Sequence, residues 1–276
     1  MTDSDFPLPE ALAPLFRGGA AGRRLDVPLP DGRLMTADSS PAPVFWMSNQ
    51  PIDGATWAAF RARHPQSGLW PLLLLHDLDG ATDRPWESGE LTPESAAEID
   101  AYDAADHMAD EWAEWVEEED DEGTDDFEDL EPFGPECPGL APPGEPSADP
   151  GEAADWYAKQ LDGQHGHLGL VAADRGADAL TVMGWTGPCN HQETPPLSAM
   201  LRSWESRFGA RVVAVGFDTL YVSVAAPPTT MEHALHVAAE HFTFCPDNIQ
   251  QGHSPYTLRA YAERLVGVNS WAFWWD

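Results

Sequence analysis

The sequence predicts an α+β protein. Its C-terminal part is expected to form a ββαββαα sheet-and-helix unit, which an acidic, Pro-rich linker joins to a smaller N-terminal α/β region. Short apolar runs alternate with amphipathic helical stripes in both parts. No apolar run reaches the roughly 18–20 residues that cross a bilayer. The expected boundaries are 1–116 for the N-terminal region, 117–150 for the linker and 151–276 for the C-terminal domain.

Charge is distributed very unevenly along the chain. The net charge is −33, and residues 90–155 hold 25 of the 47 Asp and Glu residues and neither Lys nor Arg. Such a segment repels nucleic acid and anionic membranes, and it attracts basic proteins or cations. We therefore expect a basic protein or cations as partners, and neither nucleic acid nor a membrane.

The N-terminal region contains clear strand and helix signals. Residues 44–47 predict a strand, and Asp53 is expected to cap a helix that ends near Arg63, because the residue before Pro65 disfavours the α conformation. Residues 69–75 are apolar apart from Pro71, which is typical of a strand buried on both faces.

A further helix is predicted over residues 93–116, with Pro93 at its first position. Its apolar side chains recur at helical spacing: Ala101, Ala104, Ala105, Met108, Trp112, Trp115 and Val116. Beyond it, residues 117–131 hold eleven acidic residues and residues 132–150 hold seven prolines. Neither stretch buries enough apolar surface to offset the entropy of ordering, so 117–150 is expected to be disordered.

The C-terminal domain shows the clearest alternation of elements. Strands are predicted over 168–173, 179–185, 211–217 and 220–225, and helices over 155–161, 197–208, 229–244 and from Ser254 onward. Trp271, Phe273 and Trp275 alternate with a period of two, which indicates a terminal strand with one aromatic face inward. The pattern favours a sheet with helices on one face.

Several segments of this domain resemble one bacterial protein family. They are Gly184-Trp-Thr-Gly followed by Asn190-His191, the runs 201–211, 216–228 and 239–249, and the terminal Trp271-x-Phe-Trp-Trp-Asp276. The pattern is similar to the family catalogued as domain of unknown function 4253, over about 155–276 and more loosely over 43–76. The resemblance implies a fold unit but no activity, cofactor or catalytic residue.

Two loops are the candidate binding elements, residues 184–191 and residues 245–248. Both are rich in turn-forming residues, and turn chemistry alone explains that composition. The functional interpretation is a shared pocket, because binding residues concentrate on loops held by a scaffold. Its residues would be Trp185, Asn190, His191, His241, Asp247 and Asn248. His241 lies at the edge of an apolar helix face, where a half-buried histidine is expected.

No metal site is predicted. His233, His236 and Glu240 lie within about 60° of one another on a helical wheel, but this face reads as the solvated one, and a metal site also needs ligands from a second element. Cys189 and Cys245, each close to a histidine, do not show a common zinc spacing.

No catalytic residue or cofactor is predicted either. Cys245 lies beside His241, but at a helix C-terminus, which raises the pKa of a thiol. The sequence holds no phosphate-binding loop, dinucleotide fingerprint or hydrolase motif. We expect a non-enzymatic binding or regulatory module; the alternative is an enzyme of unknown class with a site formed by the two loops. Three cysteines and an acidic start without an apolar leader favour a cytoplasmic location.

Overall fold

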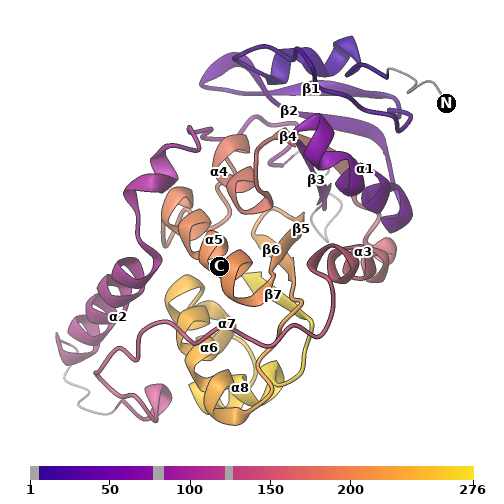
Figure 1. Ribbon diagram of the computed structural model, residues 1–276. Helices are drawn as coiled ribbons and strands as arrows, with labels where there is room; N and C mark the ends of the chain where they lie inside the picture. Colours follow the sequence, from indigo (N-terminus) through magenta and orange to yellow (C-terminus); the bar gives the residue numbers. More distant parts are fainter. Residues whose placement is uncertain (1–5, 77–83, 122–126) are drawn as a thin grey trace.

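The computed structural model describes residues 6–76, 84–121 and 127–276 (Figure 1). Within these residues seven strands form one sheet, in the order β1-β2-β4-β3-β5-β6-β7. Their bounds are β1 Gly32–Ala37, β2 Ser40–Pro51, β3 Leu69–Leu74, β4 His167–Ala172, β5 Arg211–Val215, β6 Thr219–Ser223 and β7 Ser270–Trp274. The pair β3–β5 is parallel, and the other neighbouring pairs are antiparallel.

The helices follow the sequence in the order α1 Gly54–Ser67, α2 Ala104–Asp121, α3 Pro150–Gln160, α4 Ala179–Met183, α5 Thr194–Phe208, α6 Met231–Phe244, α7 Asp247–Gln250 and α8 Leu258–Leu265. Short 3-10 turns occur at Glu10–Leu15 (η1), Glu98–Ala101 (η2), Glu128–Leu130 (η3), Asp162–Gln164 (η4) and Gly176–Asp178 (η5). The α+β class predicted from the sequence is confirmed.

Strand β4 connects the two parts of the chain. It lies between β2 and β3, so that Leu170 is opposite Trp46 and Gly169 is opposite Leu72. A strand of the C-terminal domain thus fills the middle of a sheet whose neighbouring strands come from the N-terminal region (Figure 1).

Helices cover both faces of the sheet, whereas the sequence pattern favoured one face. On β3, Leu72 and Leu74 belong to the large core formed with α5 and α6. Leu73, which points the opposite way, packs with Trp57 of α1 and Tyr157 of α3. All six residues of β3 are buried, as its unbroken apolar run predicted.

The helix predicted from Asp53 is confirmed at its start and differs at its end. The Asp53 carboxylate accepts a hydrogen bond of 2.8 Å from the Thr56 backbone N–H. The helix then continues through Pro65 to Ser67 and ends at Gly68, which adopts the left-handed conformation at φ 68°. Glycine has no Cβ to oppose that conformation, so Gly68 rather than Pro65 ends the helix.

The strand predicted over 179–185 is wrong, because this stretch forms helix α4. Four of the five helical residues, including Leu180 and Met183, are buried. A short segment that is apolar on every side has no periodicity that separates a helix from a strand. The predicted ββαββαα order is therefore corrected at its second strand, which α4 replaces, and the terminal strand predicted after the last helix is β7.

Helix α2 begins eleven residues later than the predicted start at Pro93, at Ala104. The Asp103 carboxylate accepts a hydrogen bond of 2.8 Å from the Ala105 backbone N–H, which caps the helix there. The predicted apolar stripe is retained, since Met108 and Trp112 are fully buried.

The predicted disordered linker also differs from the structure. Residues 122–126 lie outside the described residues, but residues 127–150 have defined positions. Leu130 and Ala141 are buried, and the Ala141 backbone N–H donates to the Glu240 carboxylate at 2.7 Å. Specific polar contacts and a few buried side chains thus hold a segment whose composition alone indicated disorder.

Candidate functional site

The loop over residues 184–191 starts at a backbone position that requires glycine. Gly184 has φ 78°, and a Cβ there would lie 2.2 Å from the backbone nitrogen of Pro93. Its carbonyl accepts a hydrogen bond of 2.8 Å from the Thr92 N–H. The close approach ties the loop to residues 92–93. Trp185, which follows, is fully buried and donates its indole N–H to the Gly216 carbonyl, so it anchors the loop in the core.

The loop over residues 245–248 is anchored on β7 and the C-terminal residues. The Asn248 amide donates to the Ala272 carbonyl at 2.7 Å and accepts from the Trp274 N–H at 3.1 Å. The Asp247 carboxylate accepts from the Asp276 N–H at 2.9 Å. The terminal strand therefore fixes both polar side chains of this loop.

The two loops meet, as the shared-pocket hypothesis required. The Nε2 atom of His191 lies 3.1 Å from the Oδ2 atom of Asp247. Asp247 is 4% exposed at its side chain and His191 is 27% exposed, so only the imidazole is open to solvent. Asn190 also reaches the chain end and donates to the Asp276 carbonyl at 3.2 Å.

A cleft of about 310 Å³ opens where these loops face helix α2. We call it the α2 cleft. Its lining includes Glu111, Glu114, Trp115, His191, Gln192 and Pro246. No Lys or Arg is among the described residues that line it.

Gln192 and His107 join the loop to the helix at this cleft. The Gln192 amide N–H donates to the Thr243 carbonyl at 2.6 Å, and its oxygen lies 3.0 Å from Nε2 of His107. His107 in turn lies 3.7 Å from the carboxylate of Glu111. A chain of polar contacts thus runs from α6 through the loop to the acidic face of α2.

Glu111 is electrostatically unusual. Burial, together with the nearby carboxylates of Glu114 and Asp110, raises its pKa to about 7. A desolvated carboxyl group among like charges is stabilised in its ionised form by any cation that enters. The α2 cleft is therefore suited to a positively charged ligand.

A second cleft, of about 290 Å³, lies on the other side of the same loop. Thr186, Cys189 and Glu193 line it, and His191 and Gln192 belong to both clefts. Cys189 is an exposed free cysteine. The His191 side chain is therefore accessible from two sides of the loop.

Comparison with known proteins places most of these residues in a family. Residues 167–276 match the family model described as domain of unknown function (DUF4253). This segment is a DUF4253 domain. No curated protein and no solved structure matches the chain. The DUF4253 domain contains both loops, helix α6 and the residues of β7 that anchor the second loop. Glu111, Glu114 and Trp115 lie outside this domain.

Within the DUF4253 domain, His241 does not line the α2 cleft and is fully buried, not half-buried as expected. Its Nδ1 atom lies 3.0 Å from the hydroxyl of Tyr261, which accepts a hydrogen bond from the Asn248 amide. Tyr261 thus links the imidazole of His241 to the Asn248 side chain. Burial lowers its pKa to about 3, so His241 is a neutral core residue.

Glu240 is also buried, although its helix face was interpreted as solvated. Its carboxylate forms a bidentate pair with Arg207 at 2.7 and 2.5 Å and accepts from the indole N–H of Trp204 at 2.7 Å. Helical spacing alone does not reveal such a partner on α5. In the described parts of the chain no group of three or more His, Cys, Asp or Glu side chains is placed to hold a metal ion.

Cys245 is a poor nucleophile in this environment. Its thiol is buried and donates to the Trp274 carbonyl at 2.9 Å, and burial raises its pKa to about 12.

Among the described helices, none is both long and apolar enough to cross a membrane.

Sequence reasoning named the two loops but missed the residues opposite them. Glu111 and Trp115 stand four residues apart on the predicted helix, a spacing that places them on one face. That pairing of a carboxylate with an indole was the available signal. Gln192 lies just beyond the loop, and no signal in the sequence indicated it.

Proposed function

We propose that the chain is a non-enzymatic cytoplasmic binding or regulatory module that recognises a basic segment of another protein. The observation that carries this proposal is the α2 cleft, where Glu111, Glu114 and Trp115 face the loops of the DUF4253 domain and no Lys or Arg is among the described lining residues. A lysine or arginine side chain of the partner would enter the cleft.

The chemistry of the cleft supports a cationic side chain in three ways. Glu111 and Glu114 supply the negative charge. Trp115 supplies an aromatic ring, whose face attracts cations. The acidic run that follows α2 in the sequence extends the negative potential beyond the cleft, which speeds the encounter with a basic partner and repels nucleic acid.

The test is a titration of the full chain with a lysine- and arginine-rich peptide, followed by calorimetry at low and high salt. We expect saturable binding that weakens as salt screens the charges. The variant Glu111→Gln/Glu114→Gln should weaken binding about tenfold or more, since charge-assisted contacts contribute about 1.5–3 kcal/mol each. The exposed Glu263→Gln on α8 is the matched control and should bind like the parent chain.

The result also separates specific recognition of a basic peptide from a purely solubilising role of the acidic residues. If the peptide binds equally well to the cleft variant and the control, nonspecific attraction to the acidic run explains binding and the cleft proposal is wrong. If no peptide binds at low salt, the proposal of a basic partner fails as a whole.

A second candidate, an enzyme, is favoured by one observation. His191 pairs with the nearly buried Asp247 and lines two clefts, which is the arrangement of a histidine oriented by a carboxylate for proton transfer. A panel of ester, amide and phosphate substrates would test it. Turnover that His191→Asn abolishes while peptide binding persists would favour the enzyme; an inactive parent chain would count against it.

A further inference from the structure

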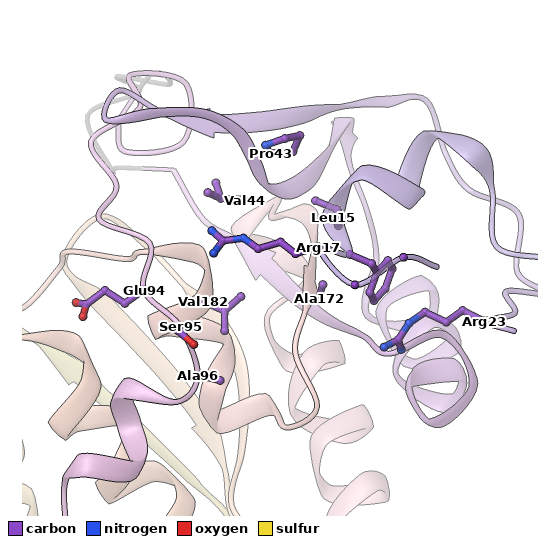
Figure 2. Close-up of a pocket in the computed structure, with 13 residues that line it drawn as sticks. Leu15, Arg17, Arg23, Pro43, Val44, Glu94, Ser95, Ala96, Ala172 and Val182 are labelled. Carbon is purple, nitrogen blue, oxygen red and sulfur yellow. The ribbon is translucent and has the colours of Figure 1, made fainter. Parts of the chain in front are cut away.

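A third cavity, of about 430 Å³, lies between the N-terminal segment and residues 94–96, and it shares Glu94 with the second loop cleft. Figure 2 shows its walls, with Arg17 on one side and Glu94 and Ser95 on the other. Its volume lies within the range of about 300–1,000 Å³ that is typical of small-molecule sites. We call it the Arg17 cavity.

Arg17 supplies the cationic wall. Among the described residues no hydrogen bond or ion pair engages its guanidinium group, although the chain has 47 acidic and only 14 basic residues. Other arginines are paired with carboxylates, for example Arg61 with Asp155 and Arg202 with Asp178. Arg23, which also lines the cavity, already donates to the Ser67 carbonyl and lies over the ring of Phe16.

Glu94 supplies the anionic wall. Its backbone N–H donates to the Thr181 carbonyl at 3.0 Å, which fixes the residue against α4. Within the described part of the chain its carboxylate has no hydrogen-bond donor or cationic partner, and desolvation together with Glu193 and Glu98 raises its pKa. The group therefore lacks the compensating positive charge that a desolvated carboxylate favours.

Apolar side chains also line the cavity beside the two charged residues. Leu15, Val44, Ala172 and Val182 form this apolar part, and Figure 2 shows the Arg17 guanidinium group between Val44 and Val182. A ligand that spans the cavity would thus meet a cation, an anion and an apolar surface.

We propose that the Arg17 cavity binds a small zwitterionic molecule of the amino-acid class. Its carboxylate would lie on Arg17, its ammonium group on Glu94, and its apolar body against Val44 and Val182. A simple anion would be repelled by Glu94, and a simple cation would be repelled by Arg17, so a ligand with both charges matches the walls best. This proposal does not depend on the function proposed for the α2 cleft.

The test uses the full chain and calorimetric titration with L-leucine, N-acetyl-L-leucine and L-leucinamide. We expect L-leucine to bind saturably and each derivative, which lacks one charge, to bind about tenfold more weakly or worse. The variants Arg17→Gln and Glu94→Gln should each weaken L-leucine binding to a similar degree. Arg259→Gln, at an exposed position on α8, is the control and should leave it unchanged.

Two outcomes would overturn the proposal. One is the absence of saturable L-leucine binding to the parent chain at millimolar concentrations. The other is binding that is indifferent to the loss of either ligand charge. The ligand series uses the unaltered protein, so it decides the question even if an Arg17 or Glu94 variant folds poorly.

Discussion

The imidazole of His191 lies 3.1 Å from the carboxylate of Asp247, and this contact joins the two loops of the DUF4253 domain. The two partners differ in their other contacts. Asp247 also accepts hydrogen bonds from the Asp276 N–H and from the Gln251 amide, whereas His191 is more open to solvent. The loss of each partner should therefore have a different effect on stability.

We predict that Asp247→Ala lowers the free energy of unfolding by about 1–3 kcal/mol, because it leaves donors without an acceptor. His191→Ala should cost less than about 1 kcal/mol, since it removes a partly exposed ion pair. Urea unfolding of both variants measures the difference. Equal losses would mean that the contact between the two side chains, and not the other hydrogen bonds of Asp247, accounts for the stabilisation.

Peptide binding at the α2 cleft should depend on pH through Glu111. Its pKa of about 7 means that the carboxyl group is largely neutral below that pH and ionised above it. A cation gains only from the ionised form, so affinity should rise with pH through about 7 and then level off. His107, which lies beside Glu111, becomes positively charged in acid and acts in the same direction.

Calorimetry at several pH values between about 6 and 8 tests this prediction. The variant Glu111→Gln should flatten the profile and bind weakly throughout the range. A profile of unchanged steepness in that variant would assign the pH dependence to another group.

Breaking the buried pair Glu240–Arg207 should lower the free energy of unfolding strongly. Glu240→Gln leaves the guanidinium of Arg207 without its charge partner, and breaking a buried pair typically costs about 3–5 kcal/mol. The exposed pair of Arg33 with Glu87 is the comparison, and Arg33→Gln should cost less than about 1 kcal/mol.

The same variant should loosen residues 127–150. Both Glu240 and Arg207 bond the backbone of Ala141, so Glu240→Gln weakens the attachment of this segment. Limited proteolysis should cut near Ala141 faster in Glu240→Gln than in Arg33→Gln. Equal cleavage rates would show that other contacts hold the segment.

Acid should destabilise the protein through His241. Its pKa is about 3 in the folded chain, against about 6.5 for an unperturbed histidine. Between these pH values the unfolded chain binds a proton that the folded chain does not. The free energy of unfolding is therefore at its full value above about pH 6.5, and it falls below that pH by up to about 1.4 kcal/mol per pH unit.

Comparison with His241→Gln isolates this contribution. The variant is less stable at neutral pH, but its stability relative to the parent chain should improve as the pH falls from about 6.5 to 4.5. A constant difference in unfolding free energy across this range would mean that His241 is protonated in the folded state.

Some features of the fold could be predicted from the sequence because they depend on local residues. The Asp53 cap, the buried run of β3 and the period-two aromatic strand at the C-terminus are of this kind. Helix α4 could not be predicted, because a fully buried segment lacks a polar face that would reveal its period.

The candidate site shows the same division. The turn-rich composition of residues 184–191 and 245–248 indicated the loops, and they do meet. The position of α2 against them and the burial of Glu240 depend on contacts between residues far apart in the sequence. Composition also misses the contacts of residues 127–150, since the hydrogen bonds of Ala141 with Glu240 and Arg207 form only in the folded chain.

The position of β4 between β2 and β3 has a consequence for synthesis on the ribosome. Strands β2 and β3 leave the ribosome before β4, so the edge of each that later pairs with β4 is at first unpaired. Residues 75–166 must be synthesised before β4 can pair with both strands. Unpaired edges of apolar strands are templates for association with other chains. The nascent chain therefore passes through a period of aggregation risk that ends only when the start of the DUF4253 domain emerges, and truncated products that stop before His167 should be substrates for chaperones or proteases.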